Sequence, residues 1–335
     1  MRAMIYCEIG PPEVMHYEEV PDPVAGPGEI VLEVHACSVN RVLDVAVRAG
    51  KQPQRNVRLP HVGGVDPVGI VTAVGPGVTD RKPGDTVAVF QNLGNPREHK
   101  MFGIHCWGGY ARFTKAPASS TCVVPKGVSY ADACVLARHA PVAWNLLVHM
   151  GKVKPGEWVL IMGAAGNLGS IGIQLAKNLG ANVIACAGSD ERAAIGRELG
   201  ADHAINYNKS DLKAEALRIT SGRGLDLVYD NIANPEPTAQ AILALGYDGR
   251  FVTAGAHGGP VVPVNFFHVY DHRITIMGSP QSRHEDAMPA LEAAAQGKMR
   301  VLVERVMPLS EAVAAHRLVE SSAATGKIIL DPSLG

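Results

Sequence analysis

The chain of 335 residues is predicted to be an α/β protein. A β-rich domain of the partly open barrel type precedes a doubly wound parallel-sheet domain. Two observations predict this fold class. Short apolar runs separated by Pro- and Gly-rich turns fill the first 125 residues, as β-strands do. From about Ser129 the pattern changes to alternating helices and strands, which is typical of a parallel sheet.

The elements follow from these patterns in order along the chain. Strands are expected in the first domain at 1–7, 29–36, 69–74, 86–90 and 109–114. An apolar helix is expected at 131–150, followed by strands at 158–162, 183–187, 203–207, 225–229 and 250–254 and a helix at 191–199. A further strand at 273–277, a helix at 284–296 and a strand at 327–330 complete the prediction.

Composition excludes several classes of function. About half of the residues (47%) are apolar and 19% are charged, which is ordinary for a globular protein. The formal net charge is −1 and no block of like charge occurs, so neither nucleic acid nor a membrane surface is an expected partner. The first residues lack the apolar core of a secretory signal, and the six cysteines form no CxxC pair. We therefore expect a cytoplasmic protein with reduced thiols.

The most informative stretch is the uncharged run from Trp158 to Ala176. It contains Gly163, Gly166 and Gly169 between an apolar strand pattern and an amphipathic helix pattern. Glycines at such a turn let the backbone approach a pyrophosphate, which the helix N-terminus attracts. The strands and helices that follow predict a dinucleotide-binding βαβαβ unit. The alternative is a tight turn that binds nothing.

Several landmarks together resemble the medium-chain dehydrogenase/reductase superfamily, in its zinc-independent quinone oxidoreductase and enoyl reductase branch. They are Gly28-Glu29, HACSVN at 35–40, VGPGV at 74–78, KPGD at 82–85, GGYARF at 108–113, GAAGNLG at 163–169, ELGADHAINY at 198–207 and TGKIIL at 325–330. The resemblance implies a GroES-like catalytic domain at 1–128, completed by about 270–335, and a Rossmann NAD(P)-binding domain at 129–269. It also implies an active site between the two domains, a small-molecule substrate, and a homodimer or homotetramer.

The resemblance also bears on zinc. The positions that hold catalytic zinc in related alcohol dehydrogenases correspond to Asn40, to Gly64-Val65-Asp66 and to about Arg138. Arginine is permanently cationic and repels a metal, and the stretch corresponding to the structural zinc lobe, 91–107, contains only Cys106. No zinc is therefore expected. The alternative is a metal held by displaced ligands among His61, His99, His105 and Cys106, whose spacing matches no usual pattern.

NADPH is favoured over NADH as the cofactor. The second Rossmann strand ends in Ala187 rather than in the acid that usually binds the ribose of NAD. Ser189 and Arg192 could then contact a 2′-phosphate, and the resemblance places Tyr207 near it. Alternatively, Ser189 caps the next helix, Arg192 is an exposed helix residue, and Asp190 adds a nearby negative charge.

Further cofactor contacts are expected from the glycine turn and from the loops that follow the later parallel strands. These residues are Gly163, Ala165, Gly166, Asn167, Leu168, Gly169, Asn231, Ala254, Gly255 and Ala256, and His257 lies beside the last of them.

Catalysis is assigned to side-chain donors. Without zinc, the Asn40 amide and the Arg138 guanidinium are the candidates that stabilise negative charge on the acceptor oxygen, and Arg138 could also anchor a carboxylate or phosphate. His139 is the candidate proton donor, or else a packed helix residue. Asp44 orients Asn40 or Arg48, or forms a local salt bridge. Asp66 organises the site.

The predicted function is hydride transfer from NADPH to a quinone, enone or activated carbonyl or alkene, without zinc. One departure bears on the detailed site, because Asn40 and Asp44 are four residues apart where the family has three, and the family's nearby tyrosine is absent. Two alternatives remain. The chain could be a metal-dependent alcohol dehydrogenase with displaced ligands, or a nucleotide-binding family member with weak catalysis.

Overall fold

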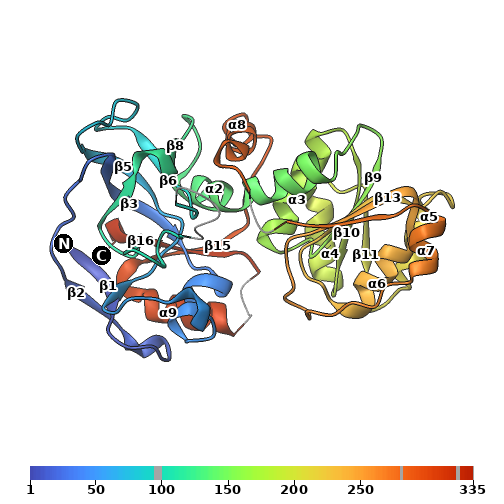
Figure 1. Cartoon of the computed structure of the whole chain (residues 1–335), viewed down its shortest axis with the longest axis horizontal. Coiled ribbons are helices and arrows are strands. Elements are labelled where there is room, and N and C mark those ends of the chain that lie inside the picture. The colour runs from blue at the N-terminus through green and yellow to red at the C-terminus, as the bar shows by residue number, and fades with distance from the viewer. Residues whose placement is uncertain (94–99, 280–281, 322–324, 335) are drawn as a thin grey trace. The chain divides into compact units, whose positions relative to one another are not determined.

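The computed structural model describes residues 1–93, 100–279, 282–321 and 325–334. They form two compact units (Figure 1). Unit 1 comprises Met1–Arg138 and Leu291–Gly335, and unit 2 comprises His139–Ala290. Both boundaries lie later than the expected 128/129 and 269/270. The first boundary falls within helix α2 (Tyr130–Trp144). The second lies later because strand β14 (Thr275–Gly278) pairs with β13 of unit 2, a long-range contact that the periodicity of the sequence cannot reveal.

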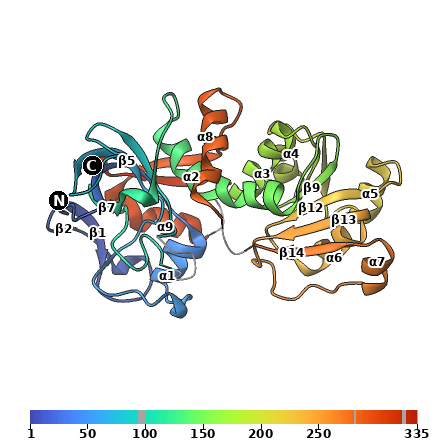
Figure 2. The ribbon, with the colours of Figure 1, turned by 45° about the horizontal axis from the view of Figure 1, so that its top comes forward.

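Unit 2 is built on a parallel sheet whose strand order, among the described residues, is β11-β10-β9-β12-β13-β14. This is the order of a dinucleotide-binding Rossmann domain. Figure 2 shows β9, β12, β13 and β14 in this sheet. Besides β14, the strands of this sheet are β9 (Trp158–Met162), β10 (Asn182–Ala187), β11 (His203–Asn206), β12 (Leu225–Asp230) and β13 (Leu245–Thr253). The helices are α3 (Asn167–Asn178), α4 (Asp190–Glu198), α5 (Leu212–Ile219), α6 (Pro235–Leu243) and α7 (Phe266–Asp271).

The apolar run at β9 forms the centre of this sheet. Four consecutive side chains, from Val159 to Met162, are fully buried because both faces of a parallel sheet are covered. Short polar residues begin the surrounding helices. Ser189 accepts a hydrogen bond from the backbone N–H of Arg192 at the start of α4, and Asp211 accepts one from Ala214 at the start of α5. Local capping and strand burial thus support the predicted alternation.

Unit 1 is β-rich, as predicted. Its strands are β1 (Arg2–Tyr6), β2 (Met15–Glu19), β3 (Glu29–Ser38), β4 (His61–Val62), β5 (Val68–Val74), β6 (Thr86–Val89), β7 (Phe113–Pro117), β8 (Thr121–Val123), β15 (Val303–Pro308) and β16 (Lys327–Asp331). Of the α-helices, α1 (Ala46–Arg48) and α9 (Ala312–Glu320) lie in unit 1, and α2 and α8 (Met288–Ala295) each cross a unit boundary.

Strand β3 organises this unit because it pairs with β5, β7 and β16. The last of these pairings is antiparallel and sets Ile329 opposite Ser38 and Leu330 opposite Cys37. The chain therefore returns to the first domain, and the end of β3 lies beside the start of β16.

Two element predictions were wrong in detail. The strand expected at 109–114 begins only at Phe113, because Gly108 and Gly109 donate hydrogen bonds to Val62 and Gly64 instead of joining the sheet. A Cβ on Gly108 would lie 2.3 Å from the Gly64 carbonyl oxygen, so no larger residue fits there. The helix expected at 131–150 is α-helical only to Trp144, and Asn145–Met150 forms π-helical turns.

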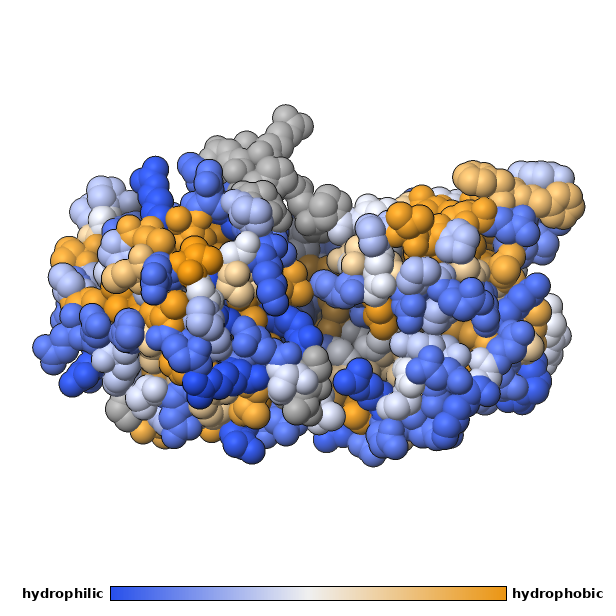
Figure 3. Space-filling model, turned by 90° about the horizontal axis from the view of Figure 1, so that it is seen from below, coloured by the Kyte–Doolittle hydropathy of each residue, from blue (hydrophilic) through white to orange (hydrophobic). Residues whose placement is uncertain are grey.

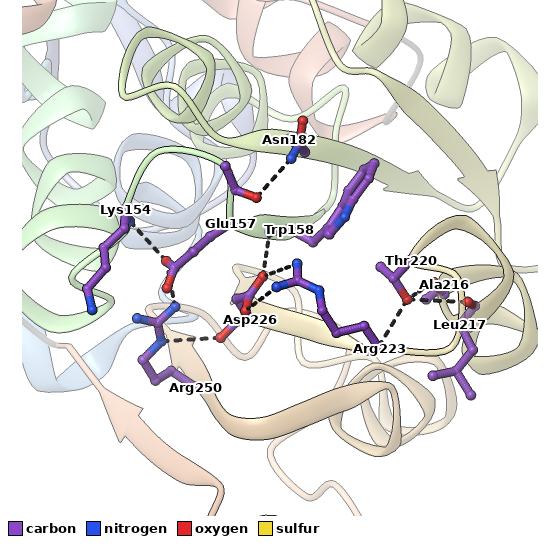
Figure 4. Close-up of polar contacts among 12 residues, drawn as sticks. Lys154, Glu157, Trp158, Asn182, Ala216, Leu217, Thr220, Arg223, Asp226 and Arg250 are labelled. Atoms are coloured by element: carbon purple, nitrogen blue, oxygen red, sulfur yellow. Dashed lines mark hydrogen bonds and ion pairs between the residues drawn. The ribbon is translucent and has the colours of Figure 1, made fainter.

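A polar network joins the amino ends of the parallel strands (Figure 4). The Arg250 guanidinium forms an ion pair of 2.8 Å with Glu157, and each side chain is only 17% exposed. Arg250 also donates to the backbone carbonyl of Asp226, whose carboxylate accepts from the backbone N–H of Trp158 and from Arg223. These contacts connect β9, β12 and β13 at one edge and leave the carboxyl ends of the strands for other contacts.

Hydrophilic residues cover much of the face shown in Figure 3, and apolar residues are exposed on both units. Across the described ranges, no helix is both long enough and apolar enough to cross a bilayer.

The Glu157–Arg250 pair predicts a measurable contribution to the stability of unit 2. Replacing Arg250 with Ala should lower the free energy of unfolding by about 1–3 kcal/mol, because it leaves a mostly buried carboxylate without its charged donor. Urea unfolding followed by circular dichroism measures this. The matched control is Arg218→Ala, which removes an exposed ion pair with Glu215 and should cost much less, because solvent screens exposed ion pairs. Equal effects of the two changes would contradict the assignment.

Candidate active site

The glycine turn of unit 2 follows β9 and begins α3. Gly163 has a positive φ of 68°, and a Cβ there would lie 2.6 Å from Oδ1 of Asn231. A Cβ on Gly169 would lie 2.2 Å from the Gly163 carbonyl oxygen. Gly166 stands at the N-cap in extended conformation, and its N–H donates to the Gly163 carbonyl. The turn therefore needs glycine both for its conformation and for the close packing of the helix against it.

The first turn of α3 offers donors to an anion. The N–H groups of Asn167, Leu168 and Gly169 precede Ser170, the first residue of the helix whose N–H donates within it, to the Gly166 carbonyl. They have no acceptor within the helix and carry the positive end of the helix dipole, so they can bind a ligand. Ala165 lies half-buried just before them. The Tyr229 hydroxyl donates to the Leu168 carbonyl at 3.0 Å and holds this turn in place. Narrow glycine packing and free N–H groups fit the pyrophosphate of a nicotinamide dinucleotide.

The end of β10 is polar but carries no acid. Ala187 is the last residue of the strand, and a Cβ on the following Gly188 would lie 2.9 Å from the Tyr207 hydroxyl. The Ser189 hydroxyl accepts from the backbone N–H of Arg192, while the Arg192 side chain is exposed. Both features match the capping interpretation of these residues and leave the guanidinium accessible.

The charge of the Asp190 carboxylate, just after the end of β10, is balanced by its neighbours. Its carboxylate accepts from the Asn206 amide at 2.7 Å and forms an ion pair with Lys209. These partners hold the pKa of the Asp190 carboxyl below its usual value, with the Asn206 hydrogen bond the largest contribution. The negative charge that the sequence placed beside Ser189 is therefore balanced by a lysine.

The loops after β12 and β13 pack against each other beside the glycine turn. The Asn231 amide donates to the Met162 carbonyl at 2.6 Å, and a Cβ on Gly255 would lie 2.4 Å from the Asn231 carbonyl oxygen. Ala254 donates its N–H to the Asp230 carbonyl. Ala256 and His257 are exposed. The structure thus brings the loop residues to the same end of the sheet as the glycine turn, as the parallel topology predicts.

Unit 1 contains a separate cluster of buried polar side chains, which we call the polar cluster (Ser38, Asn40, Asp44, Asp66 and Lys327). Asp66 is 1% exposed, and its carboxylate accepts from the backbone N–H of Ser38 at 2.9 Å, the Ser38 hydroxyl at 2.5 Å and the Asn40 amide at 3.0 Å. It holds together the end of β3 and the turn that follows. This is the organising role expected of Asp66.

Asp44 fixes Asn40 from the other side. Its carboxylate accepts from the Asn40 backbone N–H at 2.9 Å, the Asn40 side-chain amide at 3.1 Å and the Gly64 backbone N–H at 3.0 Å. Of the partners considered, it therefore orients Asn40, whereas Arg48 pairs with Glu320. Burial and the nearby Asp66 charge raise the pKa of Asp44 to about 6.

Lys327 is the residue that the sequence analysis missed. Its ammonium is almost fully buried and donates to Asn40 Oδ1 at 2.6 Å, to the Ser38 hydroxyl at 3.0 Å and to the Val39 carbonyl at 3.4 Å. Burial lowers the pKa of Lys327, and Asp66 opposes this shift. Lys327 is the lysine of the TGKIIL motif, but nothing in the spacing of the motif indicated that the pairing of β16 with β3 places its side chain beside Asn40.

These contacts change the expectation for Asn40. Its amide oxygen accepts from Lys327, and its amide nitrogen donates to Asp44, Asp66 and Ser38. The side chain is 6% exposed. Asn40 therefore has no hydrogen left to offer an acceptor oxygen in this arrangement, and it connects the polar cluster instead.

Arg138 lies half-buried on α2, near the same acids. Burial lowers the pKa of its guanidinium, and the charges of Asp66 and Asp44 oppose this shift. Its Nε is buried without a hydrogen-bond acceptor among the described residues. One turn earlier, the Cys134 thiol donates to the Asp66 backbone carbonyl at 3.0 Å and ties α2 to the polar cluster. His139 follows on the same helix, half-buried, as the first residue of unit 2.

The residues considered as displaced metal ligands have other contacts. His61 Nε2 lies 3.0 Å from the Gly103 carbonyl oxygen, and burial lowers its pKa. His105 accepts from the Met101 backbone N–H, and burial raises the pKa of the Cys106 thiol. His99 lies outside the described residues. Within the described part of the chain, no three His, Cys, Asp or Glu side chains are grouped so that they could hold a metal ion.

The packing at Gly169 predicts a loss of nucleotide binding on substitution. Gly169→Ala should weaken the binding of a nicotinamide dinucleotide at least about tenfold, since the new methyl group pushes α3 away from the turn that its N-terminus must complete. Fluorescence titration with NADPH measures this. Gly278→Ala is the control, because a Cβ there meets nothing within 4 Å. Unchanged affinity in the Gly169 variant would show that the turn is not used for nucleotide binding.

The raised pKa of Asp44 predicts a pH dependence of stability. An acid whose pKa is higher in the folded protein than in the unfolded chain favours folding at low pH, and this advantage is lost as the pH rises through about 6. The stability of the wild type relative to Asp44→Asn should therefore fall by about 2–3 kcal/mol between pH 4 and pH 7. Urea unfolding of both proteins across this range tests it. The exposed Glu8→Gln change should show no such trend.

Comparisons with known proteins agree with this fold and site. Residues 26–126 match the family model of the alcohol dehydrogenase GroES-like domain, and residues 168–296 match that of the zinc-binding dehydrogenase. The chain is 31% identical to a 2-haloacrylate reductase from Burkholderia, with 99% of each chain covered. It is 29% identical to a quinone oxidoreductase from Sus scrofa, with 98% of this chain and 97% of that protein covered.

Larger proteins and solved structures match as well. The chain is 29% identical to phthioceranic/hydroxyphthioceranic acid synthases from Mycobacterium but spans only 14% of their length. A crystal structure of an NAD-dependent alcohol dehydrogenase matches with a TM-score of 0.88 and 34% identity over 99% of both chains. A crotonyl-CoA carboxylase/reductase in complex with NADP matches with a TM-score of 0.87 and 25% identity, over 99% of this chain and 94% of that one.

Two domain models in succession, a relative that is 31% identical along its whole length, and a Rossmann sheet joined to a GroES-like unit agree with one another. The chain belongs to the medium-chain dehydrogenase/reductase superfamily of nicotinamide-dependent oxidoreductases.

Proposed function

We propose that this protein is an NADPH-dependent oxidoreductase that transfers a hydride to a quinone, an enone or another activated carbonyl or alkene, without zinc. Unit 2 would hold the cofactor at the glycine turn and the loops after β12 and β13. Unit 1 would receive the acceptor near the polar cluster and Arg138. The single observation that carries the proposal is a half-buried guanidinium, Arg138, whose Nε has no acceptor among the described residues.

The chemistry follows from that placement. A bound nicotinamide supplies the hydride, and negative charge then develops on the acceptor oxygen. Preorganised donors stabilise such charge most strongly where water is excluded. Arg138 is the donor that we assign to this oxygen, since the Asn40 amide is committed to Lys327, Asp44 and Asp66. Asn40 and Asp44 are thus positioning residues, and His139 stays the candidate for proton delivery.

The preference for NADPH rests on the end of β10. Ala187 leaves no carboxylate to repel a 2′-phosphate. Lys209 neutralises Asp190, and the exposed Arg192 guanidinium and the Tyr207 hydroxyl remain in the same loop region. One related solved structure was obtained with NADP.

Independence of zinc is supported by charge. The resemblance gives a zinc-ligand cysteine at the position of Asn40, and here Asn40 accepts a hydrogen bond from the Lys327 ammonium at 2.6 Å. A cation already bound at that position disfavours a second one. Asp66 and Arg138 occupy the other corresponding positions, and arginine is no metal ligand.

The partners that we propose are a small-molecule substrate and a second copy of the chain, as a homodimer or homotetramer. Support for self-association comes from β14, an edge strand with mostly exposed residues, and from aromatic residues on the neighbouring α7. Phe266, Phe267 and Tyr270 are 76%, 65% and 68% exposed. Edge strands flanked by apolar surface are common association sites. Analytical ultracentrifugation tests this, and a monomer at micromolar concentration would contradict it.

A cytoplasmic location is part of the proposal. All six cysteines are free, and four of them (Cys37, Cys122, Cys134 and Cys186) are buried, as is usual where thiols stay reduced. Fractionation of cells that express the full-length protein tests this location.

Steady-state assays test the function. We expect turnover of NADPH to exceed that of NADH across a panel of quinones, enones, enoyl thioesters and aldehydes, with no loss after chelator treatment. Arg138→Ala should lower kcat at least about a hundredfold while changing NADPH affinity less than threefold, because the lost donor acts on the acceptor. The exposed Arg58→Ala is the control.

Three results would contradict the proposal. Stoichiometric zinc with chelator-sensitive activity would favour the metal-dependent alcohol dehydrogenase. NADPH binding without oxidation by any member of the panel would favour a nucleotide-binding protein with weak catalysis. Full activity of Arg138→Ala would remove this arginine from the site.

A further inference from the structure

A buried carboxylate in unit 2 has no role in the function proposed above. Asp230 is the last residue of β12 and is fully buried. Its Oδ1 accepts hydrogen bonds from the backbone N–H groups of Ile232 at 3.2 Å and Ala233 at 3.1 Å, and its Oδ2 accepts one from the Thr253 hydroxyl at 2.8 Å. All three donors are uncharged. Within the described ranges, Asp230 forms no ion pair with a lysine or an arginine.

The hydrogen bonds of Asp230 do not require its charge. They hold the start of the loop after β12, where Ala233 has a positive φ of 54°, and Asn forms such turns as readily as Asp. An Asn side chain could also donate to the Thr253 hydroxyl, because this hydroxyl lies 3.2 Å from another acceptor, the Gly255 carbonyl oxygen. A buried charge without a counter-ion lowers stability. The turn alone therefore does not account for an acid at this position.

The strand register places Asp230 beside the glycine turn. Tyr229 lies opposite Ile161 on the neighbouring parallel strand, so Asp230 is level with Met162, the residue that directly precedes the turn. Neighbouring strands are about 5 Å apart. On the other side, Asp230 pairs with Thr253, which ends β13. The carboxylate thus lies at the carboxyl ends of β9, β12 and β13.

The strand order assigns this place to one half of a dinucleotide. From β9 the chain continues to β10 and β11 on one side of the sheet, and β12, β13 and β14 extend the other side. A dinucleotide binds across the point where the order reverses, with its pyrophosphate at the first glycine turn. If the adenosine half lies towards β10, where Ala187 and Ser189 are, the nicotinamide half lies towards β12 and β13.

We propose that Asp230 determines which redox state of the cofactor unit 2 binds more tightly, by favouring the oxidised form. Loss of a hydride converts the neutral dihydronicotinamide ring into a pyridinium ring with one positive charge. A buried carboxylate attracts that charge, since the protein interior screens it less than water does. Asp230 is then a specificity-determining residue that favours donation of the hydride. The inference rests on the part of the proposed function that holds a nicotinamide cofactor at this end of the sheet.

The charge state of Asp230 sets the conditions for a test. Burial raises the pKa of its carboxyl, and the hydrogen bonds from Ala233, Thr253 and Ile232 oppose this shift. The exposed His257, on the loop after β13, stabilises the carboxylate when its imidazole is protonated. Measurements at pH 8 favour the ionised carboxyl and the neutral imidazole, so Asp230 is then compared with a neutral residue without a competing cation.

Isothermal titration with NADP⁺ and with NADPH tests the inference. Asp230→Asn should raise the ratio of the NADP⁺ Kd to the NADPH Kd at least about fivefold, because only the oxidised ring loses a charge interaction. Asp226→Asn is the matched control. It removes a carboxylate at the other end of the same strand (Figure 4), about 13 Å away, and should leave the ratio within twofold. Thr253→Val keeps the charge and should weaken both forms alike.

The possible results have distinct meanings. Equal weakening of NADP⁺ and NADPH in Asp230→Asn, or an unchanged ratio, would overturn the inference and leave Asp230 as an anchor of the loop. If circular dichroism shows that Asp230→Asn is unfolded, the smaller neutral side chain of Asp230→Ser must give the same rise in the ratio.

The same titrations separate the inference from the proposed function. A rise that occurs with NAD⁺ and NADH instead would support the inference and overturn the preference for NADPH. The expected rise without oxidation of NADPH by any acceptor would overturn the proposed activity alone. A wild-type protein that binds none of the four dinucleotides would overturn both.

Discussion

The buried ammonium of Lys327 is the interaction on which the polar cluster of unit 1 depends. It donates to Asn40, Ser38 and the Val39 carbonyl, and it lies close to two carboxylates that would otherwise repel each other. Without a cation, burying Asp44 and Asp66 side by side would be strongly unfavourable. With it, the amide of Asn40 is oriented by both acids. The local geometry of the candidate acceptor site therefore follows from one lysine.

The two ends of the parallel sheet in unit 2 carry different kinds of contact. At the amino ends of the strands, Glu157, Asp226 and Arg250 form ion pairs and backbone contacts that connect β9, β12 and β13. At the carboxyl ends, glycines at 163, 169 and 255 let the turn, helix α3 and the later loops approach within a distance that no side chain would permit. The amino end thus carries the charge pairs, and the carboxyl end leaves N–H groups available for a ligand.

Much of this arrangement could be predicted from sequence. The glycine turn, the strand–helix alternation and the β-rich first domain follow from local patterns, since turn conformation and burial are encoded over a few residues. Predictions failed where distant contacts decide the outcome. The strand at 109–114 was wrong because Gly108 and Gly109 bond to residues near Gly64. Lys327 was missed, and Asn40 was read as a free donor, because only the pairing of β16 with β3 brings them together.

The same strand pairing has a consequence for how the protein is made. Lys327 and Ser38 are 289 positions apart in the chain. The two acids of the polar cluster, Asp44 and Asp66, are therefore synthesised long before Lys327. Unit 2 is one continuous segment, whereas unit 1 is made of two, so the segment of unit 2 is complete before the last segment of unit 1 is synthesised. Unit 1 must wait for the late segment to dock, which is a closure over a long separation and is correspondingly slow. During synthesis, the unit that contains the glycine turn is complete before the unit that contains the polar cluster.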